Sequence, residues 1–420
     1  MRALTGLALG AAVIVLLAAC TAAPPVATSS PEASGAPTGD GVLRIGTLLP
    51  QTGSSAFIGP AQLAGVRLAI DEINAAGGID GAPLELLSRD SGDASTATVE
   101  ASFAELAAAG TDVVIGPSSS VLARRVIPLA ATAGVTVISP AATFPDLTAV
   151  GDRGYFFRTV PDYADQGYAL GQVLSEGGPV EVGLLYIDDE FGQALAPTLA
   201  AGLEAQGSTL VVSNALPTGT TDFAAAVADL GKAAPDVVVL GSTYASVDTT
   251  KALISAVIAA GYGGAKLWLT TQNTGDYSQA LPNGTLAAVN GIIEGYQPDE
   301  AFTARLKALD STLTAVRYAA EAYDATMLAA LAALVAEDDS SPAIAGNLVD
   351  VSTGGIKCTS FAECLEALKT GGDIDYDGLS GPVNFTPQGD ISPAYYGIYS
   401  YDGENRFVFG RGVIAGRPPA

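Results

Sequence analysis

The sequence contains no histidine, and this absence excludes a large class of chemistry. Without imidazole, the chain cannot build a Ser-His-Asp or Cys-His catalytic group, a histidine-ligated zinc site or a histidine general base. Basic residues are also scarce: 19 Lys and Arg stand against 44 Asp and Glu, a formal net charge of −25 over 420 residues. Such an excess of negative charge opposes binding to phosphate backbones, so we expect no nucleic-acid partner.

Cofactor motifs are missing as well. The sequence has no G-x-x-x-x-G-K-[ST], no G-x-G-x-x-G after a strand and no G-x-S-x-G, so nucleotide-binding and α/β-hydrolase functions lose their main support and no cofactor is expected. Only 15% of residues are charged and 49% are hydrophobic, which indicates a globular chain. Its length is sufficient for two or three domains.

The N-terminus has the pattern of an export signal. Arg2 precedes a mostly apolar run, residues 3–19, that ends in Leu17-Ala18-Ala19-Cys20. Small residues before a cysteine resemble the bacterial lipobox, which predicts a lipoprotein signal peptide over 1–19 and lipidation of Cys20. Residues 20–41 have the composition of a flexible tether, so the body is expected at the extracellular face of the bacterial cell membrane. The alternative is an ordinary signal anchor with an incidental cysteine.

The two remaining cysteines are Cys358 and Cys364, six residues apart. In an exported chain an even pair at this spacing predicts a small local disulfide, and two free buried thiols are the alternative.

The body alternates short apolar runs with helical patterns from residue 42 onward. Runs such as DVVIGP and PDVVVLGS are apolar on successive residues, which is typical of parallel strands covered by helices on both faces. Two such series, 42–160 and 181–296, predict doubly wound α/β layers with parallel sheets, arranged in two similar lobes. Segment 301–335 is expected to be helical and 381–410 rich in β-structure.

Two acidic strings are candidates for other chemistry. Asp373, Asp375 and Asp377 precede Gly378 as in the first half of an EF-hand loop, but Asn384 stands where a bidentate Glu is required, so a polar turn without metal is the preferred interpretation. Residues 188–190, Asp188-Asp189-Glu190, follow a strand and could serve acid-base catalysis in a secreted enzyme. Consecutive acids on a loop more often stay solvated, so we expect no catalytic site and no enzyme.

Small hydroxyl residues follow three of the expected strands: 118–120 (Ser-Ser-Ser), 141–143 (Ala-Ala-Thr) and 243–244 (Thr-Tyr). The ends of parallel strands meet at one edge of a sheet, where backbone N–H groups at helix N-termini can hold an anion. This arrangement predicts a cleft for a small carboxylate-bearing ligand. The serines could instead only cap the following helix.

Several strings together resemble the type I extracellular solute-binding proteins of branched-chain amino acid ABC transporters. They are IGTLLPQTGSSAFIGPAQLAGVRLAIDEINAAGGIDG, DVVIGPSSS, ISPAATFPDLT, YIDDEFGQ and LSGPVNFTPQGD, and the resemblance covers nearly all of 42–410. It implies the type I periplasmic-binding-protein fold, an α/β fold with two Rossmann-like lobes and three crossovers between them. The first lobe would comprise 42–160 and 297–383, and the second 161–296 and 384–420.

The resemblance also implies the ligand contacts. Ser120 and Thr143 match the hydroxyls that hold the ligand carboxylate, and the remaining positions of the implied site are Ser118, Ser119, Ala141, Phe191, Tyr244, Gln272 and Tyr318. Gln272 and Asn273 stand where leucine receptors carry an acid for the ligand ammonium, and Ile58 replaces a tyrosine. This departure predicts a ligand that depends less on a free amine, unless an acid of 188–190 reaches the cleft.

The implied function is a lipid-anchored receptor of an ABC importer that delivers a small solute to a permease and an ATPase on separate chains. A sensory ligand-binding lipoprotein that feeds a signalling partner is an alternative.

Lipidation at Cys20 is directly testable. We expect the wild-type chain to incorporate labelled fatty acid and to fractionate with membranes, whereas Cys20→Ala should lose both properties because the acceptor thiol is gone. Labelled lipid on the Cys20→Ala chain would contradict the assignment.

Overall fold

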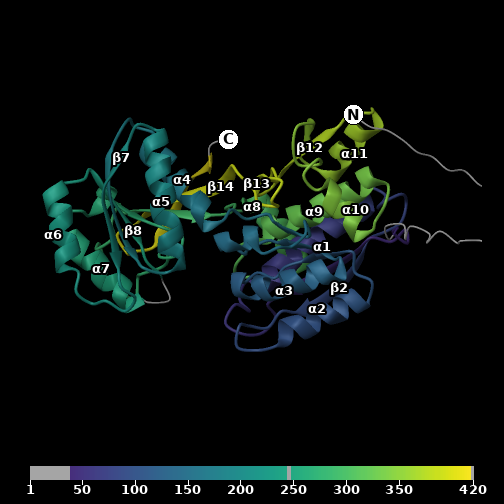
Figure 1. The fold of residues 1–420 in the computed structure, drawn as a ribbon, viewed down its shortest axis with the longest axis horizontal. Coiled ribbons are helices and arrows are strands. Elements are labelled where there is room, and N and C mark those ends of the chain that lie inside the picture. Colours follow the sequence, from purple (N-terminus) through teal and green to yellow (C-terminus); the bar gives the residue numbers. More distant parts are fainter. Residues whose placement is uncertain (1–37, 244–246, 418–420) are drawn as a thin grey trace, which may run out of the picture. The chain divides into compact units, whose positions relative to one another are not determined.

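The computed structural model describes residues 38–243 and 247–417, which contain two large β-sheets and one small sheet (Figure 1). The first large sheet is entirely parallel, with strand order β2-β1-β3-β4-β5. Its strands are β1 (Arg44–Leu49), β2 (Glu85–Asp90), β3 (Val113–Ile115), β4 (Thr136–Ser139) and β5 (Phe156–Arg158). The order reverses between β1 and β3, the point at which open α/β sheets place ligands.

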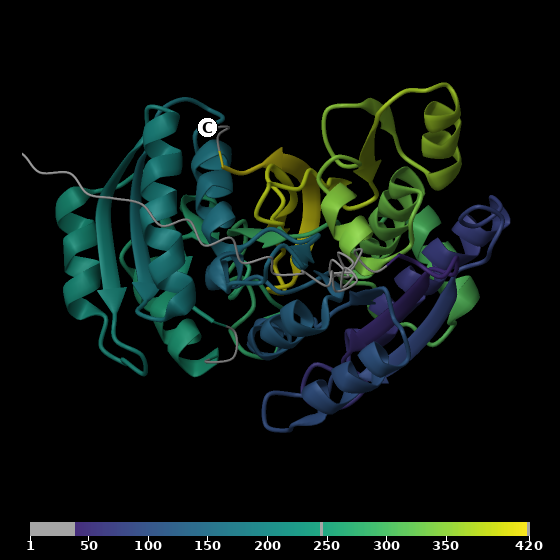
Figure 2. The same cartoon turned by 45° about the vertical axis from the view of Figure 1, so that its right-hand side comes forward.

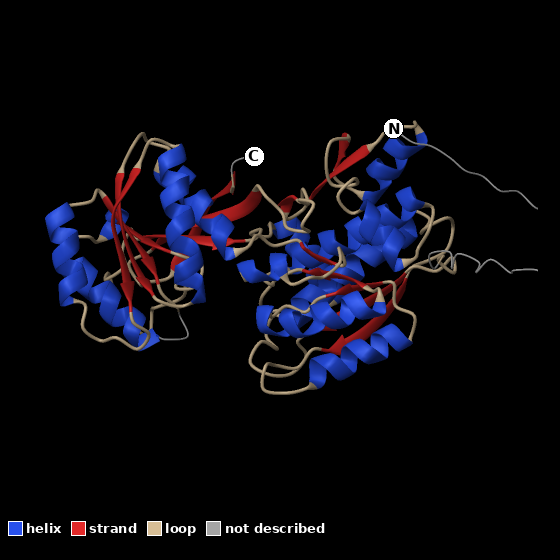
Figure 3. Cartoon of the chain, in the orientation of Figure 1, coloured by secondary structure: helices blue, strands red, loops and turns tan. Residues whose placement is uncertain are grey.

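Helices cover both faces of this sheet (Figures 1 and 3). Val113 and Ile115 of β3 pack into one core and Val114 into another, because alternate side chains of a strand point to opposite faces. One face of the sheet is covered by α1 (Gly59–Ala75) and α9 (Ala319–Ala336). Helix α8 (Glu300–Leu309) packs against α1, and α10 (Ser341–Asn347) packs against α9. The other face is covered by α2 (Thr98–Ala108) and α3 (Ser120–Ala133). A short 3₁₀ helix, η1 (Pro145–Ala149), follows β4.

The second large sheet has the order β15-β14-β10-β9-β8-β6-β7. Its parallel strands are β6 (Glu181–Ile187), β7 (Thr209–Leu216), β8 (Val237–Gly241), β9 (Leu267–Leu269) and β10 (Asn290–Glu294), and the antiparallel pair β14 (Ala394–Tyr401) and β15 (Phe407–Ala415) completes it. Leu184 packs with α4 (Tyr163–Leu174) and α5 (Glu190–Ala205), whereas Leu185 packs with α6 (Ala224–Ala233) and α7 (Val247–Ala259). The 3₁₀ helix η3 (Gly264–Lys266) precedes β9. The predicted α/β fold with parallel sheets is therefore confirmed.

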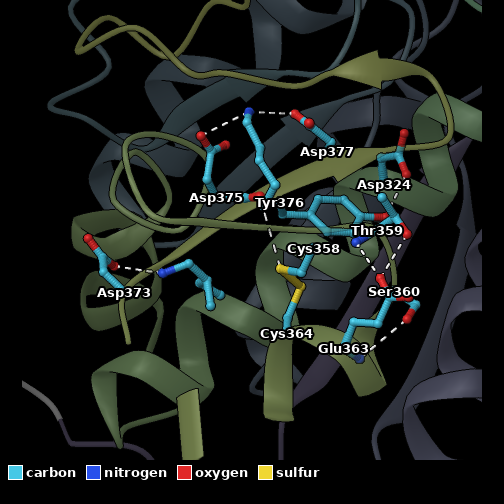
Figure 4. The surroundings of a disulfide bond; sticks show 12 residues. Asp324, Cys358, Thr359, Ser360, Glu363, Cys364, Asp373, Asp375, Tyr376 and Asp377 are labelled. Atoms are coloured by element: carbon cyan, nitrogen blue, oxygen red, sulfur yellow. Dashed lines mark hydrogen bonds and ion pairs between the residues drawn. A yellow bond between two sulfur atoms is a disulfide. The ribbon is translucent and has the colours of Figure 1, made fainter. Parts of the chain in front are cut away.

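The third sheet is small (Figure 2). A disulfide links its first strand to the helix that follows (Figure 4). The sheet consists of β11 (Ile356–Cys358), β12 (Ile374–Gly378) and β13 (Gly381–Pro382), with α11 (Phe361–Lys369) between the first two strands. Cys358 at the end of β11 is bonded to Cys364 in α11, so the predicted disulfide is present.

The acidic string Asp373, Asp375, Asp377 is not the polar turn that the sequence suggested. Residues 374–378 form strand β12, and Lys357 Nζ lies 2.9 Å from Asp375 and 2.8 Å from Asp377 (Figure 4). Strand pairing with β11 brings Lys357 opposite Asp375, a long-range contact that the local spacing of acids did not reveal. The lysine therefore supplies the positive charge beside these acids.

Segment 301–335 divides into α8 and α9, with residues 310–318 between them. Helix α9 is the one helix of the described chain that is long and apolar enough to span a membrane, but 83% of its length is buried inside the protein. Its two acids, Glu321 and Asp324, are buried and hydrogen-bonded. Asp324 accepts hydrogen bonds from Tyr376 of β12 and from Leu379 and Ser380 in the turn between β12 and β13. Helix α9 is thus a core helix in this fold.

The chain passes from one large sheet to the other after β5, after β10 and before β14. We propose that the lobe boundaries at 160/161, 296/297 and 383/384 lie in these passages. Glu321 of α9 touches two of them: its backbone oxygen accepts from Thr159 Oγ1 at 2.8 Å, and its carboxylate accepts from the Tyr296 N–H at 2.8 Å. The second carboxylate oxygen has no hydrogen-bond partner among the described residues.

Burial raises the pKa of Glu321 from 4.5 to about 8, although its backbone hydrogen bonds oppose the shift. Between these values Glu321 retains a proton in the native chain that it releases in the unfolded chain. Its contribution to stability is therefore fully present below pH 4.5 and is lost as pH rises toward 8, by up to about 1.4 kcal/mol per pH unit. Glu321→Gln should remove this contribution, measured by urea unfolding across the range. Glu204→Gln, on the exposed side of α5, should leave the slope unchanged; equal slopes in wild type and Glu321→Gln would refute the assignment.

Candidate ligand-binding site

The loop after β3 approaches β1 very closely. Gly116 has φ 122°, and a Cβ atom there would lie 2.3 Å from the Leu48 carbonyl oxygen. Only glycine fits such a backbone position. The loop therefore turns immediately after the strand and brings the three serines to the sheet edge.

The three serines have different surroundings. The Ser118 hydroxyl donates to the Gln62 side chain of α1 at 2.5 Å, and Ser119 is the N-cap residue of α3 but makes no side-chain cap bond. Ser120 Oγ accepts from the backbone N–H groups of Thr143 at 2.9 Å and Phe144 at 3.2 Å. Because the Ser120 oxygen accepts both bonds, its hydroxyl proton is still available for an anion. Simple helix capping does not account for this arrangement.

Residues 141–143 lie beside the serines at the carboxyl end of β4. Ser139 Oγ accepts from the backbone N–H of Ala142 at 3.0 Å, which shapes the turn. Ala141 packs with Ile58, Val160 and Tyr318 in a small apolar cluster. The structure thus brings Ser120, Ala141, Thr143 and Tyr318 into one neighbourhood.

Phe191 and Gln272 meet on Tyr163, a residue that the sequence analysis missed. The rings of Tyr163 and Phe191 are 4.9 Å apart in an edge-to-face arrangement, and Gln272 Nε2 donates to the Tyr163 hydroxyl. The Tyr163 N–H in turn donates to the Thr143 carbonyl at 2.9 Å. Tyr163 therefore connects the predicted carboxylate contacts to the predicted contacts of the second lobe.

Burial raises the pKa of Tyr163 well above its ordinary value of 10. The charge of Glu294 adds to this shift, and a hydrogen bond with the Thr143 side chain opposes it. The Tyr163 hydroxyl consequently stays protonated at neutral pH and can act as a neutral hydrogen-bonding group. No local sequence signal identifies Tyr163, because its partners Thr143, Phe191 and Gln272 lie far from it in the sequence.

Tyr318 has an unusual backbone. Its φ is 60°, in the left-handed region that bulky residues rarely adopt, and it stands directly before α9. Its hydroxyl donates to Glu294 Oε1 at 3.0 Å and accepts from Arg317 at 2.8 Å. Strained positions of this kind occur frequently at ligand sites.

The remaining candidates are bonded to partners of their own or lie outside the described residues. Asn273 is buried and bonded to Thr270 and Leu240, so it shapes its own turn. Tyr244 and Cys20 lie outside the described residues. The acids after β6 have local partners: Asp188 accepts from Gln193, Asp189 caps α5 through Gly192, and Glu190 pairs with Arg124. No group of three or more potential metal-ligating acids or cysteines occurs in the part of the chain that the structure describes.

A buried arginine, Arg158, holds the loop that carries Thr143. Its guanidinium donates to the carbonyls of Ala142 at 3.2 Å and Phe144 at 2.8 Å, on either side of Thr143. Its other bonds reach Asp390 at 2.6 Å, Thr148 at 2.8 Å and Asp162 at 3.3 Å. Arg158 is completely buried, and its five N–H donors have five acceptors.

Two doubly wound α/β units with hydroxyl groups at the strand ends define a two-lobed solute-binding protein. The family model described as "Periplasmic binding protein" matches residues 42–397, and the chain belongs to this family. The resemblance to type I solute-binding proteins of the branched-chain amino acid family is thereby confirmed.

Known relatives include a substrate-binding protein of chemotactic signalling and a protein named for binding Leu, Ile and Val. The chain is 27% identical to the chemotactic signal transduction system substrate-binding protein BasB of Halobacterium salinarum, over 81% of this chain and 83% of BasB. It is 28% identical to the Leu/Ile/Val-binding protein BraC3 of Rhizobium johnstonii, over 87% of this chain and 94% of BraC3. These relatives are binding proteins and not enzymes, in agreement with the prediction for this chain.

A solved structure shares the fold. The ABC transporter substrate-binding protein from Desulfitobacterium hafniense in complex with Leu has a TM-score of 0.63 and 24% identity, covering 88% of this chain and 99% of that one. This match supports the two-lobed architecture.

Arg158→Met should lower the free energy of unfolding by roughly 3–5 kcal/mol, because Asp390 and Asp162 would remain buried without their counter-charge. Urea unfolding measures the effect. Arg406→Met is the matched control, since its pair with Glu404 is exposed and should contribute at most about 1 kcal/mol. A loss below 1 kcal/mol for Arg158→Met would contradict the assigned role.

Proposed function

We propose that the chain is the lipid-anchored receptor of an ABC importer and binds a small carboxylate-bearing solute, such as a branched-chain amino acid or a related compound, between two closing lobes. The observation that carries the proposal is the contact of Ser120 Oγ with the Thr143 N–H at 2.9 Å. It brings hydroxyl groups from two strand ends together, with the Ser120 proton free for an anion. The family to which the chain belongs consists of solute-binding proteins.

The proposed site comprises nine residues. Ser118, Ser119, Ser120, Ala141, Thr143 and Tyr318 belong to the first lobe, and Phe191, Tyr244 and Gln272 belong to the second. In this arrangement the first lobe binds the carboxylate, and the second lobe covers the other end of the solute. Ligand capture of this kind involves no bond chemistry, which fits a chain without histidine.

Transport is preferred over sensing because the relative BraC3 and the D. hafniense protein are named for amino acid binding and ABC transport. The relative BasB, named for chemotactic signalling, supports the sensory alternative. Genes for a permease and an ATPase beside the gene for this chain would favour the importer. Uptake of the labelled solute should then stop when this receptor is deleted.

A thermal-shift screen over amino acids, other carboxylates and amides should identify the solute. A ligand at 100 times its dissociation constant stabilises the native state by about 2.7 kcal/mol. A chain that is stabilised by amides and by no carboxylate would contradict the proposal.

Thr143→Ala should weaken binding of the best ligand from the screen at least about tenfold, because a hydrogen bond to a charged group contributes roughly 1.5–3 kcal/mol. Isothermal titration calorimetry measures the change. Thr132→Ala, at an exposed position of α3 whose hydroxyl bonds only to its own helix, is the matched control and should bind as wild type does. Unchanged affinity in Thr143→Ala would exclude the carboxylate contact.

A further inference from the structure

Five buried acids of the described chain have a carboxylate oxygen without a hydrogen-bond partner: Asp165, Glu294, Glu321, Asp339 and Asp375. Only Glu294 among them is bonded to a residue of the proposed ligand site, through the Tyr318 hydroxyl. Glu321 contacts the passages between the sheets, and Asp375 is paired with Lys357. Glu294 is therefore distinguished from the other four acids by its location beside the proposed ligand site.

Glu294 is the last residue of β10 and is only 4% exposed. Both of its side-chain partners bind the same oxygen: the Tyr318 hydroxyl lies 3.0 Å and Arg317 Nη2 lies 3.3 Å from Oε1. Oε2 accepts no hydrogen bond from the described residues. One carboxylate oxygen of Glu294 thus accepts two hydrogen bonds, and the other accepts none from the described residues.

A buried carboxylate oxygen without a hydrogen-bond donor is energetically unfavourable. A charged donor forms a stronger hydrogen bond with it than a neutral donor does. Arg317 does not fill this role, because it binds the other oxygen at a long distance and its side chain is 44% exposed. A ligand with an N–H-bearing cationic group would supply both the hydrogen bond and the opposite charge.

Glu294 also lies beside the position where the acid of leucine receptors is missing. Its backbone N–H donates to Thr271 Oγ1 at 3.2 Å, and Thr271 directly precedes Gln272. Its charge contributes to the raised pKa of Tyr163, the residue that Gln272 contacts. Strand β10 therefore brings a carboxylate next to the strand end that carries Gln272.

We propose that Glu294 is a specificity-determining residue that accepts the cationic group, an ammonium or similar group, of the bound solute. The inference rests on the proposed function, since it assumes that Ser120 and Thr143 hold the carboxylate of the same molecule. It reverses the expectation drawn from Gln272 alone: the preferred solute carries both a carboxylate and a cation.

The test compares amino acids with their des-amino analogues. Calorimetry on the purified chain uses the pairs L-leucine and 4-methylpentanoate, L-phenylalanine and 3-phenylpropanoate, and L-glutamate and glutarate. Wild type should prefer the amine-bearing member of the pair that it binds by at least about tenfold. Glu294→Gln should abolish this preference while affinity for the des-amino member is retained.

Asp188→Asn is the matched control, because it removes one exposed acid that follows β6, another strand of the same sheet; it should keep the preference. If Glu294→Gln fails to fold, Glu294→Asp, which retains the charge on a shorter side chain, should fold and show a reduced preference. Equal binding of both members by wild type, or an intact preference in Glu294→Gln or Glu294→Asp, overturns the inference. Loss of the preference in Asp188→Asn also overturns it. If wild type binds no member of any pair, the inference is overturned, whereas the proposed function is decided separately by the wider screen of carboxylates and amides.

Discussion

The fold depends on the full pairing of one buried cation, Arg158. A guanidinium out of contact with water is tolerated only when its donors are matched and its charge is balanced. Arg158 meets both conditions by collecting acceptors from three separate stretches: residues 142–148 after β4, Asp162 before α4, and Asp390 before β14. The requirement to satisfy a single side chain thus fixes how the first sheet connects to the passages that leave it.

This constraint also affects the ligand site. Thr143 stands between the two carbonyls that Arg158 binds, and Tyr163 follows the Asp162 that balances its charge. The loop that carries Thr143 is therefore bonded to the same guanidinium as the chain passage after β5. A change in the path of that passage would therefore displace Thr143 through the hydrogen bonds of Arg158.

The sequence was sufficient for the architecture because parallel strands buried on both faces leave an unambiguous pattern of successive apolar residues, as in DVVIGP. The family resemblance supplied Ser120 and Thr143, and the structure places them in contact. Glu294, Tyr163 and Arg158 were not identified, since most of the partners that define their roles lie more than a dozen residues away. A single acid at the end of GIIEG has the same local pattern as a surface residue, and only strand packing reveals its burial.

Helix α9 has a consequence for the path of the chain out of the cell. By length and composition it meets the criteria for a membrane span, so an export machinery that threads an unfolded chain encounters a candidate stop-transfer sequence. Glu321 and Asp324 distinguish it from a true span, because a carboxylate within such a segment opposes insertion by a few kcal/mol. The two acids that this helix buries in the folded protein are also the residues that make the bilayer an unfavourable place for it.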